Sequence, residues 1–247
     1  MNKLEAFKQT VSSHPVLKHS FLTRFERGQF NKTQVKVWFE QQFYLSTSLS
    51  SAFAALFARL PNNLLQQKRL LADLINVETW GSDNKESHST YYLEVADYLE
   101  IDTQELAKRK PRKYTSEYIN IRLDLCQNPA ISVTSGLAAI ALANEFLNLY
   151  LFKIYKTGIS EFLELKNCPT SYFDVHLRDE KADFQIFHNL YETVCDEMSC
   201  CPKNKDKAAA EALRYVVQLL DARAVFLDAL LRDLNIVPIK FCFEDFK

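Results

Sequence analysis

The sequence predicts an all-α fold, a single helical bundle spanning residues 1–247. Two observations carry this prediction: the chain has only four glycines in 247 residues, and apolar residues recur at three- and four-residue spacing. Domains that contain β-sheets need glycine at turns, hairpins and phosphate-binding loops. Few glycines therefore favour long helices joined by few loops.

The expected helices are bounded by capping residues and helix breakers. Asn31 is a predicted N-cap, Gly28 ends one helix, and Pro61 and Pro111 end others. We expect helices at about residues 4–11, 16–27, 31–60, 64–80, 87–99, 103–110, 115–126, 134–155, 170–195 and 205–234. Residues 236–243 have some β character, but they do not form a convincing strand.

The composition is that of a soluble globular protein, with 47% apolar and 25% charged residues. A formal net charge of −1 argues against a nucleic-acid partner, which requires a basic surface. Residues 1–15 lack the apolar stretch of a signal peptide. The most apolar window, residues 136–152, contains Asn144, Glu145 and Asn148, which disfavours a membrane span. We therefore expect a cytoplasmic protein with neither a nucleic-acid nor a membrane partner.

The chain contains six cysteines with no CxxC pair and no secretory context. Free thiols in a reducing cytoplasm are therefore expected. The cluster of Cys195, Cys200 and Cys201 lacks the spacing of zinc ligands. The full set is Cys126, Cys168, Cys195, Cys200, Cys201 and Cys242.

Glu145 is the first residue that a purely structural interpretation leaves unexplained. It lies among residues that are nearly all apolar. Because burying an unpaired carboxylate is costly, a buried Glu145 must be protonated, paired or bound to a metal ion. The alternative is that Glu145 lies on one exposed stripe of the helix, beside Asn144 and Asn148.

The second unexplained feature is a group of possible metal ligands on one helix. His176, Glu180 and Asp183 lie at positions i, i+4 and i+7, so they share one helical face. Asp179 is close to the same face. Imidazole and carboxylate together suit iron or manganese. The alternative is a charged, solvated face that carries a stray histidine. His188 lies roughly 120° away around the helix and is a weaker candidate.

Glu78 and His88 form the third feature. Glu78 lies at the end of one expected helix, and His88 begins the next one after a loop that contains Gly81. The loop allows the two side chains to converge, which a continuous helix with a spacing of ten residues would not do well.

The order and spacing of these residues resemble those of the heme-oxygenase-like di-metal oxidases and oxygenases. That superfamily also contains the CADD-like proteins, the PqqC-like proteins and the TenA thiaminases. The likeness covers nearly the whole chain. It includes residues 17–62, which resemble the first helices of the family, and residues 77–88, which resemble its glutamate–loop–histidine segment.

The resemblance implies a heme-oxygenase-like seven-helix bundle, often a homodimer, with a metal site at its centre. Glu78, His88, Glu145 and His176 match the ligands of the family. Glu180 stands where the family has aspartate. The last histidine of the family falls at Asp183 with a spacing of seven and at Phe184 with a spacing of eight. One metal position would then have a carboxylate instead of imidazole, or would be weak or empty.

The resemblance also makes Tyr44 a candidate catalytic residue. Glu40 and Tyr44 lie four residues apart on a helix that lines the cavity in relatives. Tyr44 would supply a redox-active or hydrogen-bonding phenol near the metal. The alternative is a packed tyrosine whose hydroxyl has a hydrogen-bond partner.

The leading hypothesis is an iron-dependent oxidoreductase that acts on a small organic substrate. Two iron ions are favoured, one ion or another transition metal is the variant, and dioxygen would be the co-substrate. A cofactor-free oxidase of the PqqC-like type is an alternative, and it predicts a basic cavity, for which Arg122, Arg178 and Lys181 are candidates. A TenA-like thiaminase would need a nucleophilic cysteine in a late helix, where none is well placed. A non-enzymatic interaction protein could use the same scaffold.

Overall fold

The computed structural model describes residues 3–79, 88–198 and 202–235. Within these ranges it contains eleven α-helices and no strand, so the all-α prediction is confirmed. A few side chains inside the helices, including those of Glu180, Lys181 and Asp183, lie outside the description. So do residues 236–243, in which we noted some β character.

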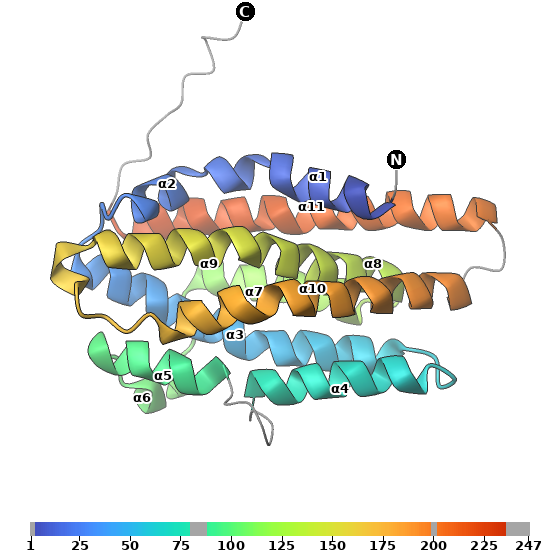
Figure 1. The fold of residues 1–247 in the computed structure, drawn as a ribbon, viewed down its shortest axis with the longest axis horizontal. Helices are drawn as coiled ribbons and strands as arrows, with labels where there is room; N and C mark the ends of the chain where they lie inside the picture. The colour runs from blue at the N-terminus through green and yellow to red at the C-terminus, as the bar shows by residue number, and fades with distance from the viewer. Residues whose placement is uncertain (1–2, 80–87, 199–201, 236–247) are drawn as a thin grey trace, which may run out of the picture.

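Four long helices lie along the length of the bundle (Figure 1). They are α3 (Lys32–Arg59), α9 (Asn144–Glu161), α10 (Ser171–Met198) and α11 (Pro202–Asp233). α1 (Lys3–Ser13) packs with α11 on one side, and α4 (Leu65–Thr79) and α5 (His88–Tyr98) lie on the opposite side. The buried apolar side chains form one cluster. The remaining helices are α2 (Ser20–Glu26), α6 (Thr103–Lys108), α7 (Lys113–Gln127) and α8 (Val133–Gly136).

The predicted boundaries at Asn31 and Gly28 are confirmed. The Asn31 side chain accepts a hydrogen bond from the Gln34 N–H at 2.9 Å, and the Gln34 side chain accepts one from the Asn31 N–H at 3.0 Å. This reciprocal capping box fixes the start of α3. Gly28 follows α2 with a φ of 62°, a left-handed conformation that glycine adopts without strain.

The helix expected at residues 16–27 is divided by His19. A 3₁₀ turn, η1 (Pro15–Lys18), comes first, and α2 begins after it. His19 Nδ1 accepts the Phe21 N–H at 3.1 Å, so the imidazole caps α2. His14 caps η1 in the same way, accepting the Val16 N–H at 3.2 Å.

The other ring nitrogen of each capping histidine faces α11. His14 Nε2 lies 3.3 Å from Asp221, and His19 Nε2 lies 3.1 Å from Asp228. These two of the five histidines therefore fasten the N-terminal segment to the last helix. Their roles are structural.

The helix expected at residues 134–155 contains a change of winding. A π-helical segment, η2 (Leu137–Ala143), lies between α8 and α9. In a π-helix each N–H bonds five residues back instead of four, so side chains beyond it are rotated relative to a continuous α-helix. Asn144 and Glu145 come directly after this segment. The π-helix therefore sets the direction of the polar residues that begin α9.

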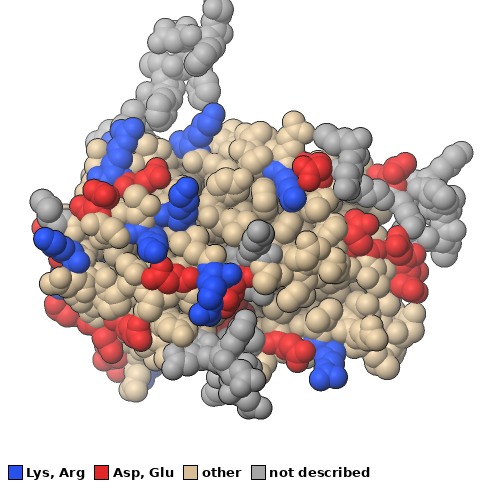
Figure 2. Space-filling model, viewed as in Figure 1, with Lys and Arg blue, Asp and Glu red and all other residues tan. Residues whose placement is uncertain are grey.

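The continuous helix of residues 133–161 is also the most apolar in the described chain. It is long and apolar enough to cross a membrane, but 61% of its most apolar window is buried inside the bundle. It is a core helix of the bundle. Lys, Arg, Asp and Glu side chains are interspersed over the face of the molecule shown in Figure 2.

The crossing of α2 and α9 depends on Gly158. A Cβ atom at this position would lie 2.9 Å from the carbonyl carbon of Phe25 and closer still to its oxygen. Backbone atoms cannot move aside as the end of a flexible side chain can. Gly158 therefore allows the two helices to approach closely.

We predict that Gly158→Ala destabilises the protein by about 2 kcal/mol. Alanine gains about 1 kcal/mol of helix propensity over glycine, but the overpacking against Phe25 outweighs this gain. Chemical denaturation measures the change in the free energy of unfolding. Ser160→Ala, at an exposed position of the same helix, should change it by less than about 0.5 kcal/mol. Equal stability of the two variants would contradict the role assigned to Gly158.

Candidate functional site

Two histidines from different helices meet in the core. His88 begins α5, His176 lies on α10, and their ring centroids are 4.4 Å apart. Glu78, near the end of α4, places Oε1 3.1 Å from His88 Nδ1. The structure thus brings together three of the residues that the sequence predicted.

Asp179 is a fourth member of this cluster, although it was not in the predicted ligand set. Its Oδ2 lies 3.8 Å from His88 Nε2. Arg178 donates two hydrogen bonds to the Asp179 carboxylate, at 2.8 and 3.0 Å, from the outside of the bundle. The available signal in the sequence was the spacing of three residues from His176.

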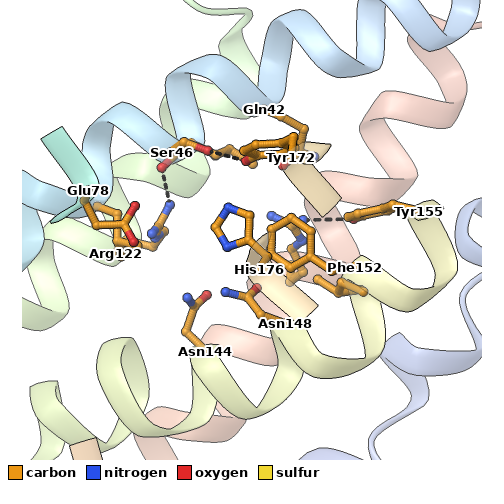
Figure 3. A pocket seen from close by; sticks show the side chains of 14 residues that line it. Gln42, Ser46, Glu78, Arg122, Asn144, Asn148, Phe152, Tyr155, Tyr172 and His176 are labelled. Carbon is orange, nitrogen blue, oxygen red and sulfur yellow. Dashed lines mark hydrogen bonds between the residues drawn. The ribbon is translucent and has the colours of Figure 1, made fainter. Parts of the chain in front are cut away.

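His176 is enclosed by aromatic rings (Figure 3). Phe152 stacks on the imidazole with a centroid distance of 3.9 Å, and Tyr172 packs edge-on at 4.8 Å. The Tyr172 hydroxyl lies 3.1 Å from Ser46 Oγ. Burial, followed by the proximity of His88, holds the pKa of His176 well below its usual value. His176 is therefore neutral at neutral pH, the form of imidazole that binds metal ions.

Glu145 is buried, so it does not lie on an exposed stripe. It is 6% exposed, and the Asn144 amide donates to its Oε1 at 3.4 Å. Burial lowers the pKa of Arg122, and the charge of Glu145 opposes this shift. Glu145 does not line either of the two cavities described below.

The metal-ligand set predicted from the sequence is only partly visible. In the part of the chain that the structure describes, no group of three or more His, Cys, Asp and Glu side chains is arranged to hold a metal ion. Glu180 and Asp183 lie on α10, one and two turns beyond His176, but their side chains are not among those described. Their role as ligands stays a prediction.

Two small cavities adjoin the histidine cluster. The first has a volume of about 50 Å³ and the second about 110 Å³. The second is lined by Phe43, Tyr92 and Leu93 together with His88, Ser89 and Thr47. The residues common to both cavities are Ser46, Glu78, Tyr172 and His176. Glu78 and His176 therefore lie at the boundary between the two spaces.

The first cavity is polar and basic. Arg122 of α7 and Arg223 of α11 line it, together with the amide side chains of Gln42, Asn144 and Asn148. Figure 3 shows both asparagine amides facing His176 from α9. Arg122 was one candidate for a basic cavity, whereas Arg223 gave no signal in the sequence, because it lies on a helix with many charged residues. Arg178 is exposed instead, and the Lys181 side chain is not described.

Tyr44 does not join this cluster. Its hydroxyl donates to the Leu106 carbonyl at 2.8 Å, and the residue lines neither cavity. Glu40 lines a separate hollow beside Arg109. In the structure a backbone carbonyl of α6 therefore holds the Tyr44 phenol away from the two cavities, and its catalytic role stays a prediction.

The remaining histidine, His188, also lies apart from the site. It lines neither cavity, and its Nδ1 is 3.5 Å from Gln185 on the same helix. His14 and His19 are helix caps and His188 lies beside Gln185 of its own helix, so the cluster contains the two other histidines, His88 and His176.

Cys126 and Cys168 are free thiols, as expected, and both are buried. Burial raises the pKa of each to about 12. Neither lines the two cavities at the cluster. Cys200, Cys201 and Cys242 lie outside the described residues.

We predict that iodoacetamide leaves Cys126 and Cys168 unmodified in the native protein at pH 8. With a pKa of about 12, each would be a thiolate in less than about 0.1% of molecules, and the thiolate is the reactive form. Peptide mass spectrometry locates the modified sites. The same protein alkylated in guanidinium chloride is the control, and both residues should react fully there. Rapid modification of either thiol in the native protein would show that it is accessible.

Comparison with models of known protein families shows which family the chain belongs to. The model of the TENA/THI-4/PQQC family matches residues 6–233. The chain belongs to this family. Solved structures of family-like proteins have the same fold, so the predicted heme-oxygenase-like bundle is confirmed.

Three proteins show how far the similarity extends in sequence and in fold. A curated relative, the 4-aminobenzoate synthase of Nitrosomonas europaea, is 25% identical over 240 residues, covering 91% of this chain and 90% of the relative. A CADD-like protein of unknown function from Nostoc punctiforme aligns with a TM-score of 0.73 at 14% identity, covering 94% and 96% of the two chains. A TenA homolog from Pseudomonas syringae has a TM-score of 0.68 at 12% identity, covering 94% and 90%.

Proposed function

We propose that this member of the TENA/THI-4/PQQC family is a metal-dependent oxidoreductase that acts on a small organic substrate. The observation that carries the proposal is the meeting of His88 and His176 with two carboxylates in the core of the bundle. The similarity to a 4-aminobenzoate synthase supports an enzymatic role and a small organic molecule as reactant or product.

The donor chemistry of the cluster fits a transition metal. Atoms bound to the same ion at about 2 Å lie roughly 3–4 Å apart, and His88 Nε2 and Asp179 Oδ2 are separated by 3.8 Å. Two histidines and one carboxylate form a set that suits iron(II). The described side chains are not arranged to hold an ion as they stand, so we infer that His88, His176 and Asp179 would hold one ion after their side chains shift toward it. Iron bound there would supply the electrons for reaction with dioxygen as co-substrate.

Glu78 has a different role in this arrangement. An ionised carboxylate can only accept, so His88 Nδ1 donates to Glu78 and leaves the lone pair on Nε2. A carboxylate on the outer nitrogen of a metal-binding histidine fixes the tautomer and the ring direction. Glu78 would therefore orient His88. Binding of a second ion would depend on Glu145, Glu180 and Asp183.

The surroundings of His176 support the same function. Phe152 and Tyr172 pack against the imidazole and fix the direction of its ring. Arg178 fixes the Asp179 carboxylate and offsets its charge. The site thus combines buried donor atoms with a cavity on either side, which an oxidation in the bundle core requires.

We predict that His88→Ala and His176→Ala each abolish iron binding. Elemental analysis after anaerobic reconstitution with Fe(II) should give about one or two ions per chain in the native protein and less than about 0.2 in either variant, because one of few ligands is lost. Oxygen consumption should fall with the iron. His188→Ala is the matched control and should keep both. Less than about one metal ion per chain in the native protein, both as purified and after reconstitution, would exclude the proposal.

A second prediction separates orientation from direct coordination. Glu78→Gln should keep the metal stoichiometry but weaken iron affinity about 10- to 100-fold, the range expected for a residue that orients a ligand. Competition with a chelator measures the affinity. Glu105→Gln, on the exposed side of α6, should have no effect. Complete loss of iron in Glu78→Gln would identify Glu78 as a direct ligand.

The basic first cavity favours one competing function, a cofactor-free oxidase. Such an enzyme would retain its activity after removal of metal by a chelator, whereas the metal-dependent enzyme would lose it. The homodimer and the cytoplasmic location stay predictions. Size-exclusion chromatography with light scattering would test the first.

A further inference from the structure

Two buried arginines line the first cavity. Arg122 is 5% exposed and Arg223 is 6% exposed, and they come from different helices, α7 and α11. They lie close enough that the charge of Arg223 adds to burial in lowering the pKa of Arg122. An arginine keeps its charge at neutral pH. Two like charges are therefore buried side by side.

The partners of these guanidinium groups are neutral. Arg122 Nη1 donates to the Leu45 carbonyl at 2.9 Å and lies 3.4 Å from Ser48 Oγ. Arg223 Nη2 donates to the Tyr155 hydroxyl at 3.2 Å. Within residues 3–79, 88–198 and 202–235, the described acids form no ion pair with either arginine, and neither Nε has a hydrogen-bond partner. The charge of Glu145 opposes the lowering of the Arg122 pKa.

A buried guanidinium without an acid is costly, so its persistence needs a reason. Gln42 adds a second polar group of the same kind, because its Nε2 is buried and has no hydrogen-bond partner in the described structure. Both arginines and the Gln42 amide line the cavity, which therefore carries two positive charges, with the Glu78 carboxylate at its boundary with the second cavity. A planar carboxylate matches the donor geometry of a guanidinium. A volume of about 50 Å³ has room for roughly three or four water molecules, or for one carboxylate group.

The second cavity differs in character. Phe43, Tyr92 and Leu93 give it apolar walls, and its volume is about 110 Å³. It meets the first cavity at His176 and Glu78. A ligand that occupies both spaces would have a charged end and an apolar body, with the atoms between them beside the histidine cluster.

We propose that the site binds a small organic carboxylate, with its carboxylate on Arg122 and Arg223 and its apolar body in the cavity of Phe43, Tyr92 and Leu93. This inference rests on the proposed function, because it names the substrate class of the same site. It also fixes the orientation: the carboxylate lies at the arginines, and the part of the molecule next to it faces His88 and His176.

The test uses benzoate as the probe, with benzamide as its neutral analogue and acetate as a carboxylate without an apolar body. Isothermal titration calorimetry measures each affinity on the purified full chain, with and without chelator. We expect benzoate to bind at least about tenfold more tightly than benzamide and acetate, in both metal states. Equal affinity for benzoate and benzamide would overturn the proposal, and equal affinity for benzoate and acetate would overturn its apolar part.

Variants assign the binding to the arginines. Arg122→Met and Arg223→Met should each weaken benzoate binding at least tenfold and leave benzamide binding unchanged. Arg59→Met is the matched control: Arg59 donates to the carbonyls of Cys126 and Ile131, so its loss should lower stability without changing benzoate affinity. Should a methionine variant fail to fold, Arg122→Lys and Arg223→Lys keep the charge but lose the forked geometry, and a loss of about three- to tenfold is expected.

The outcomes separate this inference from the proposed function. If benzoate affinity is unchanged in the variants of both arginines, the inference is overturned. A carboxylate bound directly to a metal ion would give this result and would also lose binding when a chelator is added. Arginine-dependent benzoate binding in a chain that binds no iron supports the inference while the metal-dependent function fails.

Discussion

The burial of ionisable side chains at the centre of the bundle is the constraint on which the site depends. A core surrounded by helices offers little water, so each buried charge needs a partner or a ligand. The hydrogen bond between His88 and Glu78 meets this need where α4 and α5 approach α10. Arg178 does the same for Asp179 from outside. Arg122 and Arg223 donate hydrogen bonds only to neutral groups, and this difference is why we propose the polar cavity as the place for a carboxylate.

The polar residues of α9 reach the cavity because the helix departs from regular α-helical winding just before them, in the π-helical segment η2. The π-helical segment η2 rotates the start of α9, so that Asn144 and Asn148 line the polar cavity and Glu145 is buried. The close contact of α9 with α2 at Gly158 anchors the other end of the same helix. The π-helical segment at the start of α9 and the contact at Gly158 near its end therefore set the direction in which Asn144 and Asn148 point.

Much of the fold could be predicted from the sequence, because few glycines, apolar periodicity and capping residues such as Asn31 act locally. Glu78, His88 and His176 could be predicted as a group from their order along the chain. The division of a helix by His19 could not, because an imidazole cap depends on its second contact with Asp228 of α11. The place of Arg223 in the cavity and the hydrogen bond of Tyr44 to Leu106 depend on contacts between residues far apart in the chain. A single sequence does not show which distant residues come into contact. The side chains of Glu180 and Asp183 lie outside what the structure describes.

The contacts of His14 and His19 with α11 have a consequence for synthesis of the chain. The caps of the first helices are completed by Asp221 and Asp228, which are made more than 200 residues later. The last helix also supplies Arg223 to the cavity. While the ribosome is still translating, the N-terminal segment must therefore wait for the C-terminal helix, and the bundle closes only when that helix has emerged. A truncated nascent chain would expose its apolar core to chaperones until release.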